Sequence, residues 1–188
     1  NNGQYAKSLK TLEGMNILPS EGARQGKTIF EQACLFLSMD LLKNKKYAEA
    51  MKMIEKSKEW PENLGVGKPY DVETRIQDYL DIFCLEKLKR PNETEVLRKS
   101  IIDFTNQDPS PSFNNILALK LLKEKGETEA ANTLVQKMEK SGRAGNPVNQ
   151  WVVATFKNDQ MKVNDLEKGF AKNNYFLIIK KLTEITNK

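Results

Sequence analysis

Apolar residues recur along most of the chain at the three- and four-residue intervals of amphipathic helices. From Gly22 to Asn44 they cover more than one side of the predicted helix, which indicates a central helix that is buried between neighbours. Lys45 and Lys46 form a turn, and a second helix with one apolar face is expected from Tyr47 to Lys58. The pattern therefore predicts a helical hairpin in the first third of the chain.

The same spacing predicts further helices along the rest of the chain. A helix capped by Asp71 reaches Lys89, and the next begins at Asn92, where Glu95 completes a capping box. Later helix starts are expected at two pairs of a polar residue and a proline, Ser110–Pro111 and Asn146–Pro147. Strands are not predicted anywhere, so the fold class expected is all-α.

An internal repeat accompanies these helices. The segment Tyr5–Pro19 recurs 42 positions later as Tyr47–Pro61, with Tyr, Ala, Lys, Glu and Pro at the same places. Pairs of a small and a larger apolar residue four apart continue the register, and a turn residue stands five positions before each pair. The pairs are Ser8 and Leu12, Ala50 and Ile54, Leu97 and Ile101, Ala131 and Val135, and the turn residues are Gly3, Lys45, Asn92 and Gly126.

This spacing resembles the tetratricopeptide repeat, a helix–turn–helix unit. The resemblance implies a right-handed α-α superhelix of about four hairpins with a C-terminal capping helix, in a single domain 1–188. The expected parts are the second helix of a truncated repeat (1–19), repeats at 20–61, 71–109 and 111–141, and a degenerate repeat with the capping helix at 146–188. An irregular helical bundle that contains hairpins is the alternative.

Composition and charge narrow the function classes. The net charge is +5 and the isoelectric point is near 9.0, but the lysines are scattered along solvated helix faces, so we expect no nucleic-acid binding. Apolar runs stay well below the ~20 residues of a membrane span. We expect no membrane contact and a cytoplasmic protein, or a periplasmic one if an upstream signal peptide was removed.

Histidine is absent from the sequence, which excludes histidine-based nucleophile pairs and zinc sites. Cys34 and Cys84 lie in apolar helical patterns and are interpreted as buried thiols, with a disulfide as the alternative. The acidic residues Glu73, Asp78, Asp81 and Glu86 are interpreted as a charged helix face. We therefore expect no catalytic residue, metal or cofactor, and no enzyme activity.

The connector Trp60–Asp71, WPENLGVGKPYD, is the most distinctive local string. Its glycines and Lys68 do not match a phosphate-binding loop, which needs a strand before it and Ser or Thr after the lysine. We expect Gly65 and Gly67 to adopt unusual backbone angles, with Trp60 and Tyr70 anchored on neighbouring helices. The loop is a candidate for partner binding through Trp60, Asn63, Lys68 and Tyr70.

The segment PENLGVGKPYD, preceded by ILPSEGA, resembles the C-terminal tetratricopeptide region of large bacterial proteins with an uncharacterised β-rich N-terminal domain. The N-terminal part of that family is similar to carbohydrate-active β-sandwich folds. The resemblance implies that the chain is a fragment of such a protein and has a link to carbohydrate metabolism. It carries over no catalytic residue.

The expected function is a non-catalytic scaffold for protein–protein or interdomain interaction. Expected partners are a protein or peptide, the missing N-terminal domain, or a second copy through the truncated edge, where Tyr5, Leu9 and Leu12 would be exposed. The alternative is a structural or oligomerisation module that supports the missing domain. The offsets of the repeat place eleven residues in a partner-binding groove: Gln32, Leu35, Met39, Tyr79, Ile82, Glu86, Arg90, Phe113, Ile116, Lys120 and Lys123.

Overall fold

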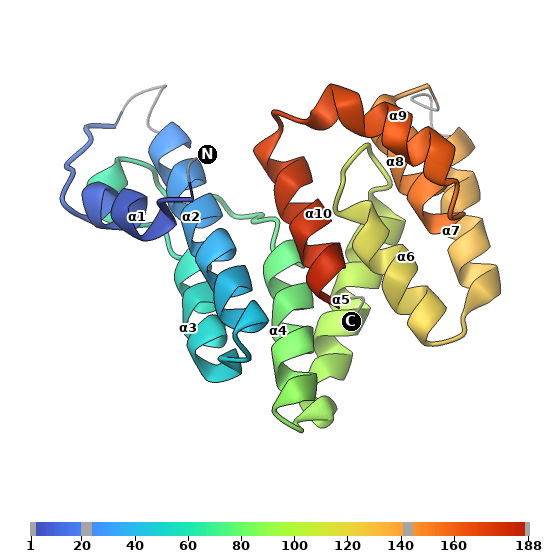
Figure 1. Ribbon diagram of the computed structural model, residues 1–188, viewed down its shortest axis with the longest axis horizontal. Coiled ribbons are helices and arrows are strands. Elements are labelled where there is room, and N and C mark those ends of the chain that lie inside the picture. Colours follow the sequence, from blue (N-terminus) through green and yellow to red (C-terminus); the bar gives the residue numbers. More distant parts are fainter. Residues whose placement is uncertain (1–2, 20–23, 141–144, 187–188) are drawn as a thin grey trace. The chain divides into compact units, whose positions relative to one another are not determined.

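The computed structural model describes residues 3–19, 24–140 and 145–186, which are all-α and contain no strand (Figure 1). The all-α prediction is confirmed. Residues 20–23, which include the end of the ILPSEGA motif, lie outside the described residues. The helices are α1 (Tyr5–Glu13), α2 (Arg24–Lys43), α3 (Tyr47–Lys58), η1 (Glu62–Leu64), α4 (Arg75–Lys87), η2 (Pro91–Glu93), α5 (Thr94–Gln107), α6 (Asn115–Glu124), α7 (Thr128–Lys140), α8 (Pro147–Phe156), α9 (Gln160–Phe170) and α10 (Asn174–Thr186).

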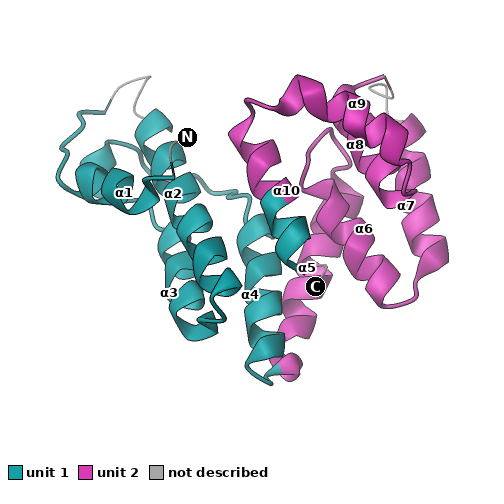
Figure 2. Cartoon of the chain, in the orientation of Figure 1, with its two compact units in different colours: residues 1–90, 181–188 teal, residues 91–180 magenta. Residues whose placement is uncertain are grey.

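The chain divides into two compact units (Figure 2). Unit 1 comprises residues 1–90 and 181–188, and unit 2 comprises residues 91–180. The division falls between α4 and α5, inside the predicted repeat 71–109, and again within α10.

Four helices end in the same backbone turn. The second residue after each helix end has a positive φ, and the N–H of the residue that follows it donates to the carbonyl oxygen five residues earlier, which is a Schellman motif. The left-handed residues are Lys45 (φ 58°), Lys89 (φ 60°), Gly126 (φ 75°) and Asn158 (φ 58°). The N–H to oxygen pairs are Lys46 to Leu41 (3.0 Å), Arg90 to Leu85 (2.8 Å), Glu127 to Leu122 (2.9 Å) and Asp159 to Ala154 (2.9 Å). The same turn conformation therefore recurs at the ends of α2, α4, α6 and α8.

The turn predicted at Asn92 is misplaced. Lys89 takes the left-handed conformation three residues earlier, and Pro91–Glu93 form the 3-10 turn η2. The N-cap position of α5 is Glu93, which makes no side-chain capping bond, so the predicted capping box of Asn92 and Glu95 is wrong. Lysine at a left-handed position has no compositional signature of the kind that Gly126 provides.

Two other helix starts differ from prediction. α4 begins at Arg75 with Thr74 at the N-cap, so Asp71 is not the cap. α6 begins at Asn115 because local bonds hold the preceding segment as a turn: Asp108 accepts from the Ser110 N–H at 3.0 Å, and the Asn115 amide donates to the Ser110 carbonyl at 2.9 Å. The start at Asn146 is confirmed, since its side chain accepts from the Val148 N–H at 2.9 Å.

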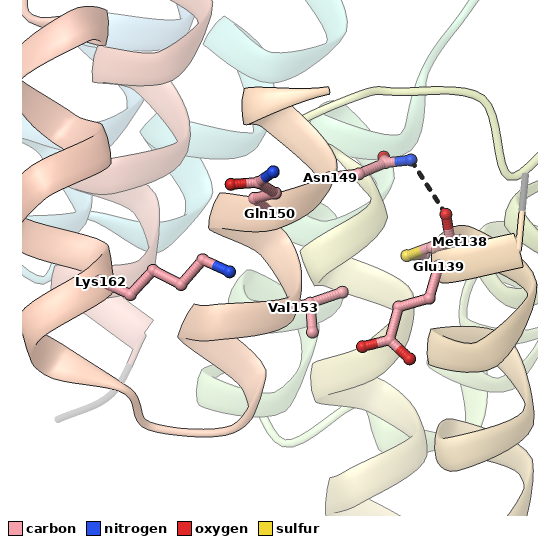
Figure 3. A pocket seen from close by; sticks show the side chains of 6 residues that line it. All are labelled: Met138, Glu139, Asn149, Gln150, Val153 and Lys162. Carbon is pink, nitrogen blue, oxygen red and sulfur yellow. Dashed lines mark hydrogen bonds between the residues drawn. The ribbon is translucent and has the colours of Figure 1, made fainter. Parts of the chain in front are cut away.

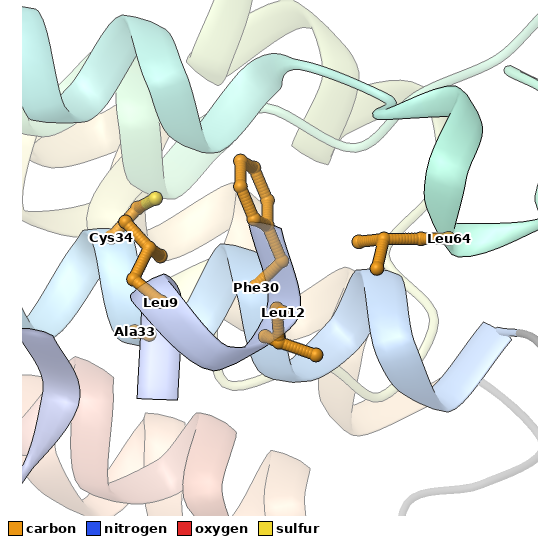
Figure 4. Packing of buried hydrophobic residues seen from close by; sticks show 6 residues of the cluster. All are labelled: Leu9, Leu12, Phe30, Ala33, Cys34 and Leu64. Carbon is orange, nitrogen blue, oxygen red and sulfur yellow. The ribbon is translucent and has the colours of Figure 1, made fainter. Parts of the chain in front are cut away.

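The core of unit 1 joins α1 to α2 and to the connector (Figure 4). It contains Leu9 and Leu12 of α1, Phe30, Ala33 and Cys34 of α2, and Leu64 of η1. The Tyr5 ring stacks on Phe36 with centroids 4.5 Å apart. The prediction that Tyr5, Leu9 and Leu12 form an exposed apolar edge is therefore wrong, because α2 covers that face of α1. Exposed Ala6, Lys7 and Lys10 lie on the other face.

The core of unit 2 is built around an aromatic cluster. Phe113 contacts Trp151, Phe170 and Phe176, with ring centroids between 4.9 and 5.6 Å apart. Trp151 and Phe176 also lie edge to face at 5.4 Å. Phe113, which was predicted to face a groove, belongs to this core.

The register of α7 provides a stability test. Ala131 is fully buried, whereas Ala48 on α3 is exposed. Ala131→Phe is expected to lower the free energy of unfolding by about 1–3 kcal/mol because the ring overpacks the interior. Ala48→Phe should leave the free energy of unfolding nearly unchanged, and urea denaturation of both variants makes the comparison. Equal midpoints would contradict the register.

Candidate functional site

Most of the predicted groove residues are buried. Gln32, Leu35 and Met39 of α2, Tyr79 and Ile82 of α4, and Phe113 and Ile116 of unit 2 are each at most 8% exposed. Glu86, Arg90 and Lys123 are exposed, and Lys120 is half-buried, which lowers the pKa of its ammonium. Partner binding at these positions stays a prediction, and a partner could reach only the last four without displacing buried side chains.

A buried ionic cluster lies between α3 and α4. The ammonium of Lys58 lies 2.9 Å from a carboxylate oxygen of Asp81, 3.6 Å from one of Asp78 and 2.8 Å from one of Glu55. The Thr74 hydroxyl donates to Asp78 at 2.9 Å. Asp78 and Asp81 are only 8% and 5% exposed, so the interpretation of these two residues as a solvated charged face is wrong.

Burial and pairing act in opposite directions on this cluster. Burial raises the pKa of both carboxyl groups, Asp78 and Asp81, although the hydrogen bonds from Thr74 and Lys58 oppose the shift. Burial alone would lower the pKa of Lys58, but hydrogen bonds to Glu55 and Asp81 outweigh it and raise the pKa. Lys58 therefore stays charged, and the cluster ties α3 to α4 through one ammonium.

The connector between α3 and α4 clamps the end of α1. The Asn63 side-chain amide donates to the carbonyl oxygens of Leu12 and Met15 at 2.9 and 2.8 Å. The Asn63 carbonyl accepts from the Ile17 N–H at 2.8 Å, and Gly65 has a φ of 69°. Asn63 thus holds the segment that follows α1, so the bonds of this predicted partner-binding residue serve a structural role.

Of the two residues predicted to anchor the connector, only Trp60 packs on a neighbouring helix. The half-buried Trp60 ring lies 5.0 Å from the ammonium of Lys27, which donates to the Ser57 carbonyl at 2.9 Å, so Trp60 is an anchor as predicted. Tyr70 is fully exposed and anchors nothing, and Lys68 is also exposed. Gly67 is not among the positive-φ residues, so only Gly65 has the unusual backbone angle that was predicted for both glycines.

Both cysteines are free and buried, as the favoured interpretation of the sequence predicted. Cys34 lies on α2 and Cys84 on α4, and each side chain is 0% exposed. Burial raises the pKa of each thiol to about 12. These thiols are hydrophobic packing groups and are poorly suited to act as nucleophiles.

The thiols are therefore expected to resist labelling in the native chain. Because burial raises the pKa of both thiols to about 12, very little thiolate is present at pH 8, and the buried sulfur is also out of reach of a reagent. A colorimetric thiol assay should detect almost no reactive thiol in buffer and two per chain in denaturant. Rapid labelling of either cysteine in buffer would contradict this burial.

A wide depression opens on the surface of unit 1 at the ends of α2 and α4. Its volume is about 770 Å³, and its lining residues are Leu42, Lys43, Lys45, Tyr47, Phe83, Lys87, Glu184 and Ile185. The Tyr47 and Phe83 rings meet edge to face with centroids 6.4 Å apart, and the Lys87 ammonium lies 5.1 Å from the Phe83 ring centre. We call this surface the basic depression. Periodicity placed Tyr47 on a helix face but gave no sign that three lysines surround it.

A smaller cavity of about 150 Å³ lies in unit 2 (Figure 3). Met138 and Glu139 of α7, Asn149, Gln150 and Val153 of α8, and Lys162 of α9 line it. Asn149 is 2% exposed and donates to the Met138 carbonyl at 3.4 Å. Glu139 pairs with Lys157 at 3.0 Å. The cavity is large enough for a few water molecules.

Comparison of the chain with protein-family models, with curated proteins and with solved structures gives no match. The family resemblance of the sequence stays a prediction. Within the described ranges, each helix is too short or too polar to cross a lipid bilayer. The same ranges bring together no group of three or more metal-ligating side chains.

Proposed function

We propose that this chain is a non-catalytic, tetratricopeptide-like scaffold that binds a peptide or protein partner. The observation that carries the proposal is the recurrence of one Schellman turn after α2, α4, α6 and α8. A turn repeated in this way is compatible with a series of helical hairpins, and such series present extended binding surfaces. The basic depression offers such a surface within one unit.

The family resemblance of the connector suggests which larger protein this scaffold would belong to. A fragment of a large bacterial protein with a carbohydrate-active N-terminal domain would use these hairpins to engage a partner or that domain itself. The connector supports the resemblance in one respect, because Asn63 and Gly65 have defined structural roles between helices. The exposed Lys68 and Tyr70 leave the second half of the connector accessible to a partner.

A peptide-display screen tests the proposal. The whole chain is immobilised and presented with a random peptide library, and enriched peptides are synthesised and titrated by calorimetry. The proposal expects enriched sequences that bind saturably with one site per chain, and hydrogen exchange should show slower exchange over the bound surface. If the screen gives no peptide with saturable binding, the scaffold proposal fails.

A further inference from the structure

We infer that the basic depression of unit 1 binds an acidic peptide segment that also carries an apolar side chain. This inference rests on the proposed scaffold function and names its ligand. Carboxylates of the peptide would lie on Lys43, Lys45 and Lys87, and the apolar side chain would pack on Phe83 and Tyr47. The structure supports this assignment through charge, through the apolar floor and through size.

The charge of the lining favours an anion. Three lysines and one glutamate, Glu184, line the depression, which gives a local net charge of +2. Within the described residues Lys43, Lys45 and Lys87 form no ion pair, whereas the adjacent Lys46 pairs with Glu49 at 3.3 Å. Uncompensated lysines around a concave surface attract a carboxylate-bearing partner and set its orientation.

The floor of the depression favours a segment that is partly apolar. Phe83 and Tyr47 are half-buried and stand edge to face, and Leu42 and Ile185 contribute aliphatic walls. A volume of about 770 Å³ exceeds the size of one side chain, and it lies within the roughly 300–1,000 Å³ of ligand-binding clefts. Tyrosine, which Tyr47 contributes to the floor, is among the residues enriched at binding hot spots.

A nucleic acid is also an anion with flat apolar groups, but the ring geometry is less suited to it. The planes of Tyr47 and Phe83 meet at 68°, and Lys87 lies over the Phe83 ring, so the two rings offer no parallel platform for successive bases. Glu184 would repel phosphates at the same surface. An acidic peptide can place its carboxylates beside the lysines and away from Glu184.

The test uses the whole chain and four fluorescent probes. Three are peptides of one length that combine leucine with glutamate, with glutamine or with lysine, and the fourth is a thymidine oligonucleotide. Binding is measured by anisotropy at low and high salt for three proteins: the native chain, a Lys43→Glu/Lys45→Glu/Lys87→Glu variant, and a Lys7→Glu/Lys10→Glu/Lys52→Glu control. The control reverses three exposed lysines outside the depression, so both variants have the same net charge. Circular dichroism verifies that each variant is folded.

We expect the glutamate peptide alone to bind, with affinity about tenfold weaker or more in the depression variant, near native in the control, and reduced by salt. Equal binding by the two variants would place the peptide elsewhere and overturn the inference while leaving the scaffold proposal standing. The same follows if library peptides bind but the glutamate peptide does not, or if the oligonucleotide binds through the three lysines. If neither the library nor any probe peptide binds, both proposals fall.

Discussion

Lys58→Met is expected to lower the free energy of unfolding by about 3 kcal/mol at neutral pH, because it leaves two buried carboxylates without their cation. Asp78 and Asp81 are each at most 8% exposed, and Lys58 lies within 3.6 Å of both. Methionine fills the volume of the lysine stem, so the effect reports the lost charge. The value lies at the lower end for a buried pair because the Lys58 side chain is 25% exposed.

The pH dependence of this loss follows from the direction of the carboxyl pKa shifts. Burial already raises the pKa of Asp78 and Asp81 in the folded chain, and removal of Lys58 raises both further. The folded variant then binds more protons than the unfolded chain at mildly acidic pH, so its relative stability rises as the pH falls. The difference in free energy of unfolding between the native chain and Lys58→Met should therefore be largest at neutral pH, and it should shrink as the carboxyl groups become protonated.

The native chain should also lose stability at alkaline pH, through Lys58 itself. The pKa of Lys58 is raised above its unfolded value, so its contribution is complete below the unfolded pKa and is lost as the pH rises through the folded one. Urea denaturation from pH 4 to 8 measures the acid limb for both proteins. Lys52→Met, which removes an exposed lysine from the same helix, is the control and should be neutral at each pH.

Two outcomes would contradict the role assigned to Lys58. One is a deficit that does not change with pH, which would indicate lost packing and not an uncompensated charge. The other is an equal effect of Lys52→Met. As a further check, Asp81→Asn in the Lys58→Met background should recover part of the lost stability at neutral pH, because it removes one of the two uncompensated charges.

The ionic cluster shows why sequence alone misjudged α4. Asp78 and Asp81 are three apart and therefore neighbours on one helix, which is also the pattern of a solvated face. Their partner Lys58 is 23 positions before Asp81, on another helix. Spacing within one helix says nothing about which residue of another helix lies opposite, so the burial of this pair needed the structure.

The groove residues show a related limit. Helix periodicity correctly placed Leu35, Met39, Tyr79 and Ile82 on helices, and the buried character of α2 was predicted from its apolar pattern. The repeat offsets, however, give the side of a helix and not what covers that side. The hairpin turns at Lys45 and Gly126 were predicted, whereas the turn at Lys89 was placed at Asn92, because asparagine is a stronger turn signal than lysine.

Gly65→Ala is expected to lower the free energy of unfolding by more than about 2 kcal/mol, because two unfavourable effects coincide at this residue. Its φ of 69° is disfavoured by about 1–2 kcal/mol in a residue with a Cβ. A Cβ built there would also lie 2.4 Å from the Ile17 carbonyl oxygen, which is backbone and cannot rotate away. Ile17 would have to move, and its N–H bond to Asn63 would be strained.

Two other glycines separate the two effects. Gly126 has a φ of 75° with no atom within 4 Å of a built Cβ, so Gly126→Ala should show the backbone cost alone, near 1 kcal/mol. Gly67 has open space and no positive φ, so Gly67→Ala should be neutral or slightly stabilising through the unfolded state. Urea denaturation should rank Gly65→Ala as the least stable and Gly67→Ala as the most stable.

The order of stability among the three glycine variants also tests whether the connector supports the core of unit 1. Gly65 follows Leu64, which is 1% exposed in the core shared with α1 and α2, so a shift of Gly65 disturbs that core as well as the clamp on Ile17. Gly65→Ala should therefore increase the reactivity of Cys34, whose sulfur lies in the same core, whereas Gly126→Ala should not. The two variants could instead lower the free energy of unfolding equally and leave Cys34 equally protected. That result would mean that the segment at Ile17 moves easily to make room for the new Cβ, and that the connector does not clamp the end of α1.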